Sequence, residues 1–294
     1  MAEFTAVILA AGQGTRMKSE FPKVLHRVCG VPMVEQVIRL VREAGSDHQV
    51  VITGFKEHLV REYLGNQEVS FVHQEERLGT GHAVMQAVPE FEKDRDSYVL
   101  VICGETPLLR AETIAHLAKT CREEGAAASV LTAILDDPFG YGRVLRDEAG
   151  HMTCIVEQKD GTPEQLAVHE INTGTYVFQV GALLDALEKI DNKNAQGEYY
   201  LTDVFGIMIK EGLKVVPVAA DDADETMGVN SRIQLAAADR ILRLRKAEEL
   251  MASGVSIIDP EHTYIEQDVE VGCDTVLLPG TMLQGKTVIG KHCE

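Results

Sequence analysis

The chain has 294 residues, of which 45% are hydrophobic and 25% charged, and its formal net charge is −18. This length predicts a large core and more than one domain. The excess of negative charge argues against nucleic acid or an anionic membrane as a bulk partner. No apolar segment reaches the roughly 20 residues of a membrane helix, and the N-terminus lacks a signal-peptide pattern. We therefore expect no membrane insertion.

Six cysteines are scattered along the chain, and none pairs with another at C-x-x-C spacing. Without an export signal, this distribution predicts reduced thiols in the cytoplasm and argues against a structural zinc site. The acidic composition adds one expectation about ligands. A phosphorylated ligand would have to be held by local cations, and a divalent metal would be a natural helper.

The first apolar run, residues 6–11, stops at two glycines placed one residue apart. This pattern predicts a buried strand followed by a loop whose backbone approaches a ligand closely. Three cations follow, Arg16, Lys18 and Lys23. Exposed amides beside cations favour a phosphate site, although a plain strand and turn with solvated basic residues is the alternative. Met17 breaks both the dinucleotide motif and the P-loop pattern.

Strand and helix patterns then alternate as far as residue 124. Short apolar strands are predicted at residues 49–53, 69–73 and 98–103, and amphipathic helices at 33–44, 56–64, 79–88 and 111–124. This alternation predicts a mostly parallel α/β sheet. Because ligands bind beyond the carboxyl ends of such strands, the strand ends at Gly12, His73–Gln74 and Gly104–Glu105 should share one crevice.

The middle of the chain is less regular. Strands are predicted at residues 128–135, 154–157, 171–178 and 214–218, with a tight turn at 139–143 and a polar loop at 191–203 that leads into a helix ending near Gly212. An acidic loop at residues 221–225 follows the last of these strands.

The C-terminal part changes pattern twice. Ser231 can cap a long helix from Arg232 to about Ala252, which we expect to link two domains. Beyond Gly254, two sets of residues recur every six positions: Ile265, Val271, Leu277, Leu283 and Ile289, then Val269, Thr275, Thr281, Thr287 and Cys293. Such a period predicts a parallel β-helix, whose coils normally stack for many turns and carry a cap. We expect domains at 1–230, 231–253 and 254–294, in a piece of a longer protein.

Motifs that occur in order along the chain are similar to those of one enzyme family. They read LAAGQGTRM at 9–17, PKVL at 22–25, HQEERLGTGHA at 73–83, GYGR at 140–143, VEQKD at 156–160, EINTG at 170–174, NAQGEYYLTD at 194–203 and GVN at 228–230. The first two resemble the signature of sugar-1-phosphate nucleotidyltransferases. The ordered set, with the hexads, resembles the bacterial bifunctional N-acetylglucosamine-1-phosphate uridyltransferase/glucosamine-1-phosphate acetyltransferases. This resemblance implies a Rossmann-like nucleotidyltransferase domain, a linker helix and the first coils of a left-handed β-helix.

The implied reaction joins UTP and N-acetylglucosamine-1-phosphate to give pyrophosphate and UDP-N-acetylglucosamine, a precursor for the cell wall. The sugar phosphate would attack the α-phosphorus in line, with Mg²⁺ as cofactor and without a covalent enzyme intermediate. The family also implies a homotrimer for the full-length protein. The acetyltransferase site would lie on later coils, so we expect no acetyltransferase activity from these 294 residues.

The resemblance further implies roles for particular residues. Uracil and ribose would be held by the backbone of Leu9, Ala10, Ala11 and Gly12 together with Gln74, Gly79 and Thr80. The catalytic residues would be Arg16, Lys23 and Glu105, with Arg16 and Lys23 on the phosphates. The sugar pocket would be lined by Gly142, Glu157, Asn172 and Thr202, with further substrate contacts from Cys103, Gly104 and Asn230. Mg²⁺ would be held by Glu105 and Asn230, with phosphate oxygens and water as the other ligands.

One position departs from the family pattern. The family has Asp in the motif G-D-[TV]-P-L, whereas this chain reads GETPL at residues 104–108. Glu105 keeps the charge but adds one methylene group. Magnesium requires ligand distances near ~2.0–2.1 Å, and a misplacement of about 1 Å can cost about 100-fold in rate. We therefore expect Glu105 to face the metal with weakened binding or turnover.

Two other functions stay open at this point. The first is a related nucleotidyltransferase that acts on glucose-1-phosphate. The second is a catalytically impaired subunit that binds nucleotide sugars, which the replacement at Glu105 and the β-helix repeats motivate.

Overall fold

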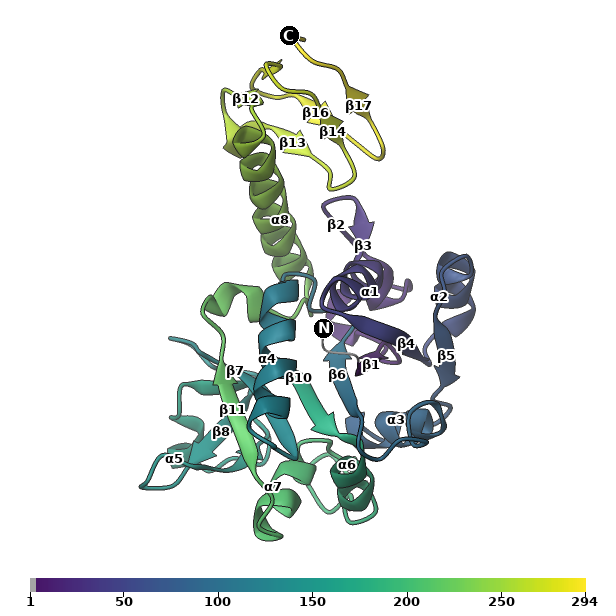
Figure 1. The fold of residues 1–294 in the computed structure, drawn as a ribbon, viewed down its shortest axis with the longest axis vertical. Coiled ribbons are helices and arrows are strands. Elements are labelled where there is room, and N and C mark those ends of the chain that lie inside the picture. The colour runs from purple at the N-terminus through teal and green to yellow at the C-terminus, as the bar shows by residue number, and fades with distance from the viewer. Residues whose placement is uncertain (1–3) are drawn as a thin grey trace.

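A computed structural model of the chain describes residues 4–294. Its largest part is a central sheet with the strand order β11-β7-β10-β6-β1-β4-β5 (Figure 1). The strands are β1 Phe4–Leu9, β4 Ser46–Thr53, β5 Ser70–His73, β6 Tyr98–Cys103, β7 Ala128–Ile134, β10 Glu170–Gln179 and β11 Val215–Ala219. A hairpin of β8 Gly142–Arg146 and β9 Met152–Val156 is attached to β10.

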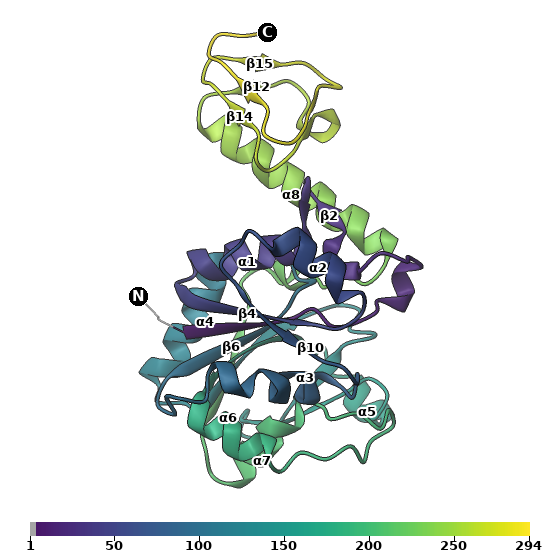
Figure 2. The same ribbon diagram turned by 90° about the vertical axis from the view of Figure 1, so that its right-hand side faces the viewer.

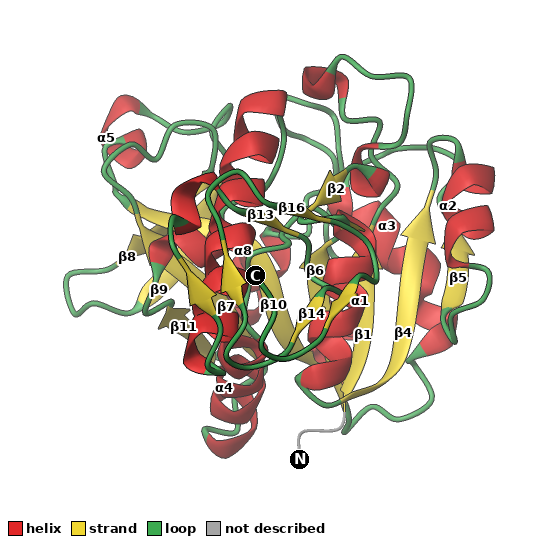
Figure 3. Cartoon of the chain, turned by 90° about the horizontal axis from the view of Figure 1, so that it is seen from above, coloured by secondary structure: helices red, strands yellow, loops and turns green. Residues whose placement is uncertain are grey.

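The direction of β10 determines which residues meet at one edge of this sheet. β1 is parallel to β4 and β6, β4 is parallel to β5, and β7 is parallel to β11. β10 is antiparallel to both β6 and β7, so the other strands of the path all run the opposite way. The start of β10, with Asn172, therefore lies at the edge where β1 and β6 end at Leu9 and Cys103. Figure 3 shows β1, β4 and β5 side by side in the paired order.

Helices cover both faces of the sheet (Figure 2). One face carries α1 Met33–Glu43, α2 Glu57–Leu64 and α4 Ala111–Glu123, and the other carries α3 Thr80–Ala87, α6 Val180–Leu187 and α7 Asp203–Lys210. Val7 and Ile8 are neighbours on β1, are both fully buried, and belong to the cores on opposite faces. A strand buried on both sides must be apolar at successive positions, which explains the continuous apolar run near the N-terminus. None of the helices in the described part of the chain is long and apolar enough to cross a bilayer.

The structure confirms the predicted Rossmann-like α/β class and the mostly parallel sheet. The helix at 33–44 and the strand at 98–103 appear as α1 and β6 within one residue of the predicted ends. The first strand ends at Leu9, two residues before the predicted end, although the Ala10 N–H still donates to the Ile52 carbonyl of β4 at 2.9 Å. The elements that were not predicted include β8, the one-turn helix α5 Pro163–Leu166, and α6. α6 follows β10 directly, and only Gln179, whose side-chain oxygen accepts from the Ala182 N–H at 3.2 Å, separates the apolar residues of the two elements.

Beyond residue 254 the chain forms two stacked coils of short strands. These are β12 Ser256–Ile257, β13 Tyr264–Ile265, β14 Glu270–Val271, β15 Val276–Leu277, β16 Met282–Leu283 and β17 Val288–Ile289. β12 pairs with β15, β13 with β16 and β14 with β17, always in parallel. Tyr264 pairs with Met282 and Glu270 with Val288, so three hexads make one coil. Ile265 and Leu277 point into a small buried core. This is the stacking that the six-residue repeat predicts.

α8 Arg232–Ala252 connects the sheet to the coils (Figure 1). Its first half packs on the α/β part, where Ala238 joins a cluster with Val28 and Leu108. Its last turns pack on the coils, where Ala247 and Leu250 join the coil core. The helix is therefore held at both ends by buried contacts.

A short hairpin makes a second connection between the two parts. It consists of β2 Arg27–Val28 and β3 Val31–Pro32. At its tip, the Cys29 N–H donates to Asp239 Oδ1 on α8 at 2.8 Å, and the Cys29 carbonyl accepts from the Gln267 N–H of the coils at 3.0 Å. Arg39 on α1 adds a two-pronged contact to Asp268, with N–O distances of 2.6 and 3.0 Å. The hydrogen bond from Arg39 also lowers the pKa of the Asp268 carboxyl.

We expect the pair of Arg39 and Asp268 to couple the coils to the α/β part by about 1 kcal/mol, because both side chains are partly exposed and water screens them. The measurement is a double-mutant cycle of urea unfolding with Arg39→Met, Asp268→Asn and the double variant. Arg240→Met with Glu261→Gln, an ion pair within the α8 and coil region that is more exposed, is the matched cycle and should give a smaller coupling. Equal coupling in the two cycles would contradict a special role for Arg39.

Candidate active site

Two adjoining cavities lie at the sheet edge where β1 and β6 end. The smaller one, of about 240 Å³, is bounded by the glycine loop and by the segment 74–80. The larger one, of about 380 Å³, is bounded by β8, the start of β10 and the segment 228–230. Four residues line both cavities: Leu9, Thr80, Cys103 and Glu105. The strand ends predicted to share a crevice do so, and the two cavities form one continuous site.

In the smaller cavity, Gln74 is fixed by internal hydrogen bonds. Its side chain is buried, and its amide nitrogen lies 3.1 Å from the Gly79 carbonyl and 3.1 Å from His82 Nδ1. The Gly79 carbonyl accepts one amide hydrogen, and His82 Nδ1 accepts the other in the tautomer that is protonated at Nε2. In this arrangement the carbonyl oxygen of Gln74 is the atom left to face a ligand, and His82 acts through Gln74 as a structural residue.

In the larger cavity, two polar side chains are held in place from behind. Glu157 Oε1 accepts from the Thr202 hydroxyl at 3.0 Å. The Asn172 amide nitrogen donates to the buried Tyr176 hydroxyl at 2.8 Å, while Asn172 Oδ1 accepts from the Gly174 N–H at 3.1 Å. Burial raises the pKa of the Glu157 carboxyl above its usual value. These contacts place a carboxylate and an amide on the wall of the cavity with fixed orientations.

The loop 137–142 borders the larger cavity and is anchored by a buried arginine. Arg143 is 2% exposed. Its guanidinium donates to the Tyr141 carbonyl, to the Leu166 carbonyl at 3.3 Å and to Gln158 Oε1 at 3.2 Å. The same Gln158 oxygen accepts from the Gly140 N–H at 2.9 Å. All these partners are neutral oxygens, so Arg143 uses its fork of donors to shape the loop rather than to pair with a carboxylate.

Tyr141 ties this loop to the opposite side of the cavity. Its hydroxyl accepts a hydrogen bond from the backbone of Gly228, and the Arg16 guanidinium lies close enough to favour the phenolate. Burial outweighs both effects and raises the pKa of Tyr141. The loop 137–142, the glycine loop and the segment 228–230 therefore meet around the larger cavity.

Lys23 lies between the two predicted metal ligands. Its Nζ atom is 2.5 Å from Glu105 Oε1 and 2.9 Å from Asn230 Oδ1. A carboxylate oxygen and an amide oxygen thus both face the position that the ammonium of Lys23 occupies. Magnesium in proteins is bound by oxygen ligands of these kinds. Among residues 4–294, no group of three or more His, Cys, Asp or Glu side chains could hold a metal. The two oxygens fit a metal whose other ligands come from substrate and water.

The structure places nearly all predicted site residues on these walls. The smaller cavity is lined by Leu9, Ala11, Gly12, Lys23, Gln74, Gly79, Thr80, Cys103 and Glu105. The larger cavity is lined by Arg16, Gly142, Glu157, Asn172, Thr202 and Asn230, besides the residues common to both. Ala10 and Gly104 line neither cavity: Ala10 is buried, and the Gly104 N–H donates to the Leu9 carbonyl at 2.9 Å. Through backbone hydrogen bonds, Ala10 and Gly104 hold the ends of β1 and β6, next to the lining residues Leu9, Cys103 and Glu105.

Several lining residues were missed from the sequence. Arg77 and Glu198 line the smaller cavity, and Phe139 and Tyr141 the larger one. Arg77 lies within the motif at 73–83, so a cation inside a segment predicted to hold the nucleotide was a usable signal. Phe139 is 77% exposed, and an exposed aromatic residue at a cavity mouth cannot be told from a surface residue in sequence alone.

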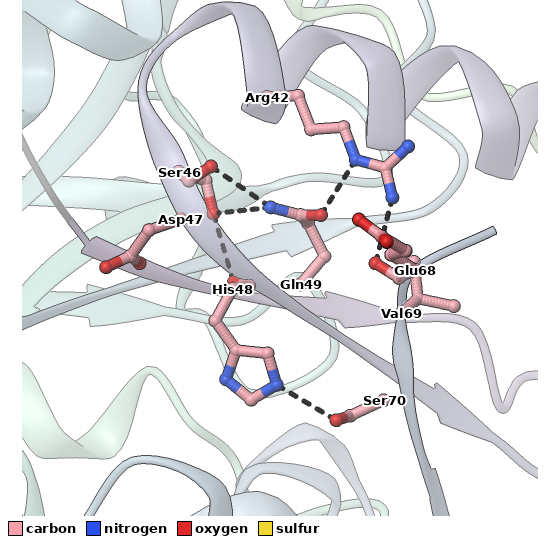
Figure 4. A pocket seen from close by; sticks show the side chains of 8 residues that line it. All are labelled: Arg42, Ser46, Asp47, His48, Gln49, Glu68, Val69 and Ser70. Carbon is pink, nitrogen blue, oxygen red and sulfur yellow. Dashed lines mark hydrogen bonds between the residues drawn. The ribbon is translucent and has the colours of Figure 1, made fainter.

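Another hollow, of about 470 Å³, lies around the start of β4 and β5 (Figure 4). Its polar side chains bind one another. Arg42 Nε donates to Gln49 Oε1 at 2.8 Å, the Gln49 amide donates to the Ser46 carbonyl at 3.1 Å, and His48 Nε2 lies 2.9 Å from the Ser70 hydroxyl. This hollow lies away from the ends of β1 and β6, and the side chains of Arg42, Gln49 and His48 already have partners within it.

We expect Glu157→Gln to raise the stability of the fold at neutral pH. Burial raises the pKa of Glu157 in the folded state, so the folded chain holds this proton more tightly than the unfolded chain. Protonated Glu157 contributes to the free energy of unfolding at low pH, and this contribution is lost as the pH rises through the pKa of Glu157 in the folded state. Ionised Glu157 therefore destabilises the fold at pH 7. The variant should unfold at a higher temperature at pH 7, and the difference should shrink towards pH 4. An unchanged difference across this range would contradict the assignment.

Comparison with known proteins shows which family the chain belongs to. The sequence pattern of the MobA-like NTP transferase domain matches residues 6–197. The chain belongs to this family. It is 49% identical over 294 residues to the bifunctional protein GlmU of Caldanaerobacter subterraneus, covering all of this chain and 64% of that protein. It is 50% identical over 293 residues to the bifunctional protein GlmU of Geobacillus thermodenitrificans, covering all of this chain and 63% of that protein. The chain thus spans somewhat less than two thirds of these relatives.

A solved structure supports the fold of this family member. The UDP-glucose pyrophosphorylase complexed with UDP-glucose matches with a TM-score of 0.65 at 16% identity, over 81% of this chain and 98% of that one. At this identity the likeness concerns the fold. The resemblance to the bifunctional bacterial enzymes, predicted from the ordered motifs, is confirmed by the identities of about one half over the whole chain.

Proposed function

We propose that this chain transfers UMP from UTP to N-acetylglucosamine-1-phosphate, giving UDP-N-acetylglucosamine and pyrophosphate. The observation that carries the proposal is the joining of two cavities at Glu105 and Thr80, one bounded by the glycine loop and one by polar groups suited to a sugar. Reacting groups bound in adjoining cavities are held for direct attack, which is the main contribution of an enzyme to phosphoryl transfer.

The nucleotide would occupy the smaller cavity and the sugar phosphate the larger one. The Gln74 carbonyl oxygen is positioned to accept from the N–H of uracil. Glu157 accepts hydrogen bonds from sugar hydroxyls, and the Asn172 amide serves the hydroxyls or the N-acetyl group. Lys23 and Arg16 offset the negative charge that builds on the leaving pyrophosphate. The chain itself thus supplies binding, orientation and charge.

A divalent metal, Mg²⁺ in our proposal, would be held by Glu105 and Asn230. When bound, it supplies charge that stabilises the phosphates during transfer. Glu105 and Asn230 are fixed relative to each other, because the Glu105 carbonyl accepts from the Val229 N–H at 2.9 Å. Holding both ligand residues through one backbone bond keeps the two oxygens aimed at a common point.

The test is release of pyrophosphate by the purified chain with UTP, Mg²⁺ and N-acetylglucosamine-1-phosphate. Glucose-1-phosphate is offered in parallel and in competition. Turnover with the N-acetylated sugar and little with glucose-1-phosphate is the expected result. The reverse preference would assign the chain to the related glucose-1-phosphate enzymes, and tight binding of nucleotide sugar without turnover at saturating Mg²⁺ would make it a binding subunit.

Three further properties belong to the same proposal. We assign the chain to the cytoplasm, which its six free cysteines support. We divide it into a uridyltransferase domain, 1–230, a linker helix, 231–253, and β-helical coils, 254–294. Homotrimer formation would depend on these coils, whose outer face exposes Met282 and Val288.

A further inference from the structure

The ammonium of Lys23 occupies the point where the two proposed metal ligands meet. It is bound at 2.5 Å by Glu105 and at 2.9 Å by Asn230, and the Lys23 side chain is 8% exposed. A divalent ion bound by the same two oxygens would stand within a few ångströms of this ammonium. Two cations at such a distance, beside one carboxylate, repel each other strongly.

Close packing holds the Lys23 side chain in this position. Gly14 has a φ of +66°, and a Cβ atom at this position would lie 2.6 Å from Lys23 Cβ. The glycine loop therefore packs directly on the lysine stem. On the other side, the Asn230 N–H donates to Gln234 Oε1 at 2.9 Å, which fixes the residue that receives the ammonium.

The length of residue 105 contributes to this arrangement. A glutamate places its carboxylate one methylene group further from the backbone than an aspartate does, and here it ends on the ammonium of Lys23. With the shorter side chain, the same backbone would leave a gap of about 1.5 Å. Glu105 thus favours the ion pair with Lys23 at the expense of a metal.

We infer that Lys23 is the resident cation of this site in the ligand-free chain and that it excludes divalent metal until the anionic nucleotide draws it away. The inference rests on the proposed function for the nature of the nucleotide, but the exclusion concerns residues of this chain alone. Lys23 and the metal would then exchange places: the phosphates attract the ammonium, and the vacated oxygens accept the metal together with phosphate oxygens. Metal and nucleotide must bind with positive cooperativity.

The test is a titration with Mn²⁺ as the probe, in the absence of nucleotide and sugar, read by electron paramagnetic resonance of the free ion. Lys23→Met should bind Mn²⁺ at least about tenfold more tightly than the unchanged chain, because removal of an adjacent unit charge gives an effect of this order. Lys23→Gln, a second neutral replacement, should behave in the same way, and circular dichroism checks that each variant is folded.

Three matched variants locate the effect. Lys18→Met removes the same charge from an exposed position of the same loop and should leave Mn²⁺ affinity nearly unchanged. Lys23→Arg keeps the charge and should show no tenfold gain. Adding Glu105→Gln to Lys23→Met should abolish the gain. If the neutral Lys23 variants bind Mn²⁺ no better than Lys18→Met, the inference is wrong. Because no substrate is present, this outcome is independent of whether the unchanged chain releases pyrophosphate.

Discussion

Glu105→Asp is expected to raise the rate of Mg²⁺-dependent pyrophosphate release by about 10- to 100-fold. The glutamate carboxylate reaches Lys23 Nζ at 2.5 Å, and this pairing aims it at the ammonium. Shortening the side chain withdraws the carboxylate by about 1.5 Å, which weakens the pair and restores the aspartate of the family motif at this position. Octahedral magnesium tolerates little error in ligand position, and errors near 1 Å can change rates by about 100-fold.

The matched variants for this prediction are Glu105→Gln and Glu112→Asp. Glu105→Gln keeps the length and removes the charge, so it should fall below the unchanged chain. Glu112→Asp shortens an exposed glutamate in the first turn of α4 and should have no effect on turnover. The measurement is kcat for pyrophosphate release as a function of Mg²⁺ concentration. Equal rates for the unchanged chain and Glu105→Asp would show that the glutamate is compensated elsewhere.

The elements of the sheet could be predicted because burial on two faces demands a simple pattern. Val7, Ile8, Val101 and Ile102 must all be apolar, and apolar runs separated by helical periods are easy to recognise. The coils could be predicted equally well, because each coil consists of three hexads and every hexad needs an apolar residue at the same position. The order of the strands, and the reversal of β10, depends on long-range pairing that local patterns do not contain.

The candidate site was predictable to the extent that it lies at strand ends. The lining by Gly12, Gln74 and Glu105 follows from where the strands stop. The pairing of Lys23 with Glu105 joins residues 82 positions apart, and the tie between Tyr141 and Gly228 is similarly remote. Such contacts depend on the geometry of the crevice, and no spacing in the sequence encodes them. In the ligand-free chain Lys23 is paired with Glu105, and its binding to the phosphates stays a prediction.

The contacts of Arg143 could not be predicted from the sequence either. Replacement of Arg143 by methionine is expected to lower both the stability of the fold and the binding of the sugar phosphate. A methionine of similar length fills the space but leaves the carbonyls of Tyr141 and Leu166 without their donor, while the Gln158 oxygen keeps only its hydrogen bond from the Gly140 N–H. Hydrogen bonds to a charged group contribute about 1.5–3 kcal/mol each, and buried acceptors left unpaired add their desolvation cost. We expect Arg143→Met to lower the free energy of unfolding by about 3 kcal/mol.

The effect on binding should be selective, because Arg143 acts on one cavity. The loop 137–142 borders the larger cavity, whereas the smaller cavity, which we propose for the nucleotide, is bounded by other segments. We expect the KM for the sugar phosphate to rise about tenfold, a change of about 1.4 kcal/mol, while the KM for UTP stays nearly constant. A variant that was merely less stable would not separate the two substrates, so this difference identifies Arg143 as a positioning residue.

Two arginine variants complete the experiment. Arg143→Lys keeps the charge but loses the planar fork, so it should recover part of the stability and little of the sugar binding. Arg146→Met, three residues along the same strand, removes a half-exposed arginine that pairs with Glu170, and it should cost about 1 kcal/mol or less without changing either KM. Urea unfolding followed by circular dichroism gives the stabilities, and steady-state kinetics gives the two KM values. Equal increases in both KM values for Arg143→Met would show that the loop 137–142 does not act on the sugar side alone.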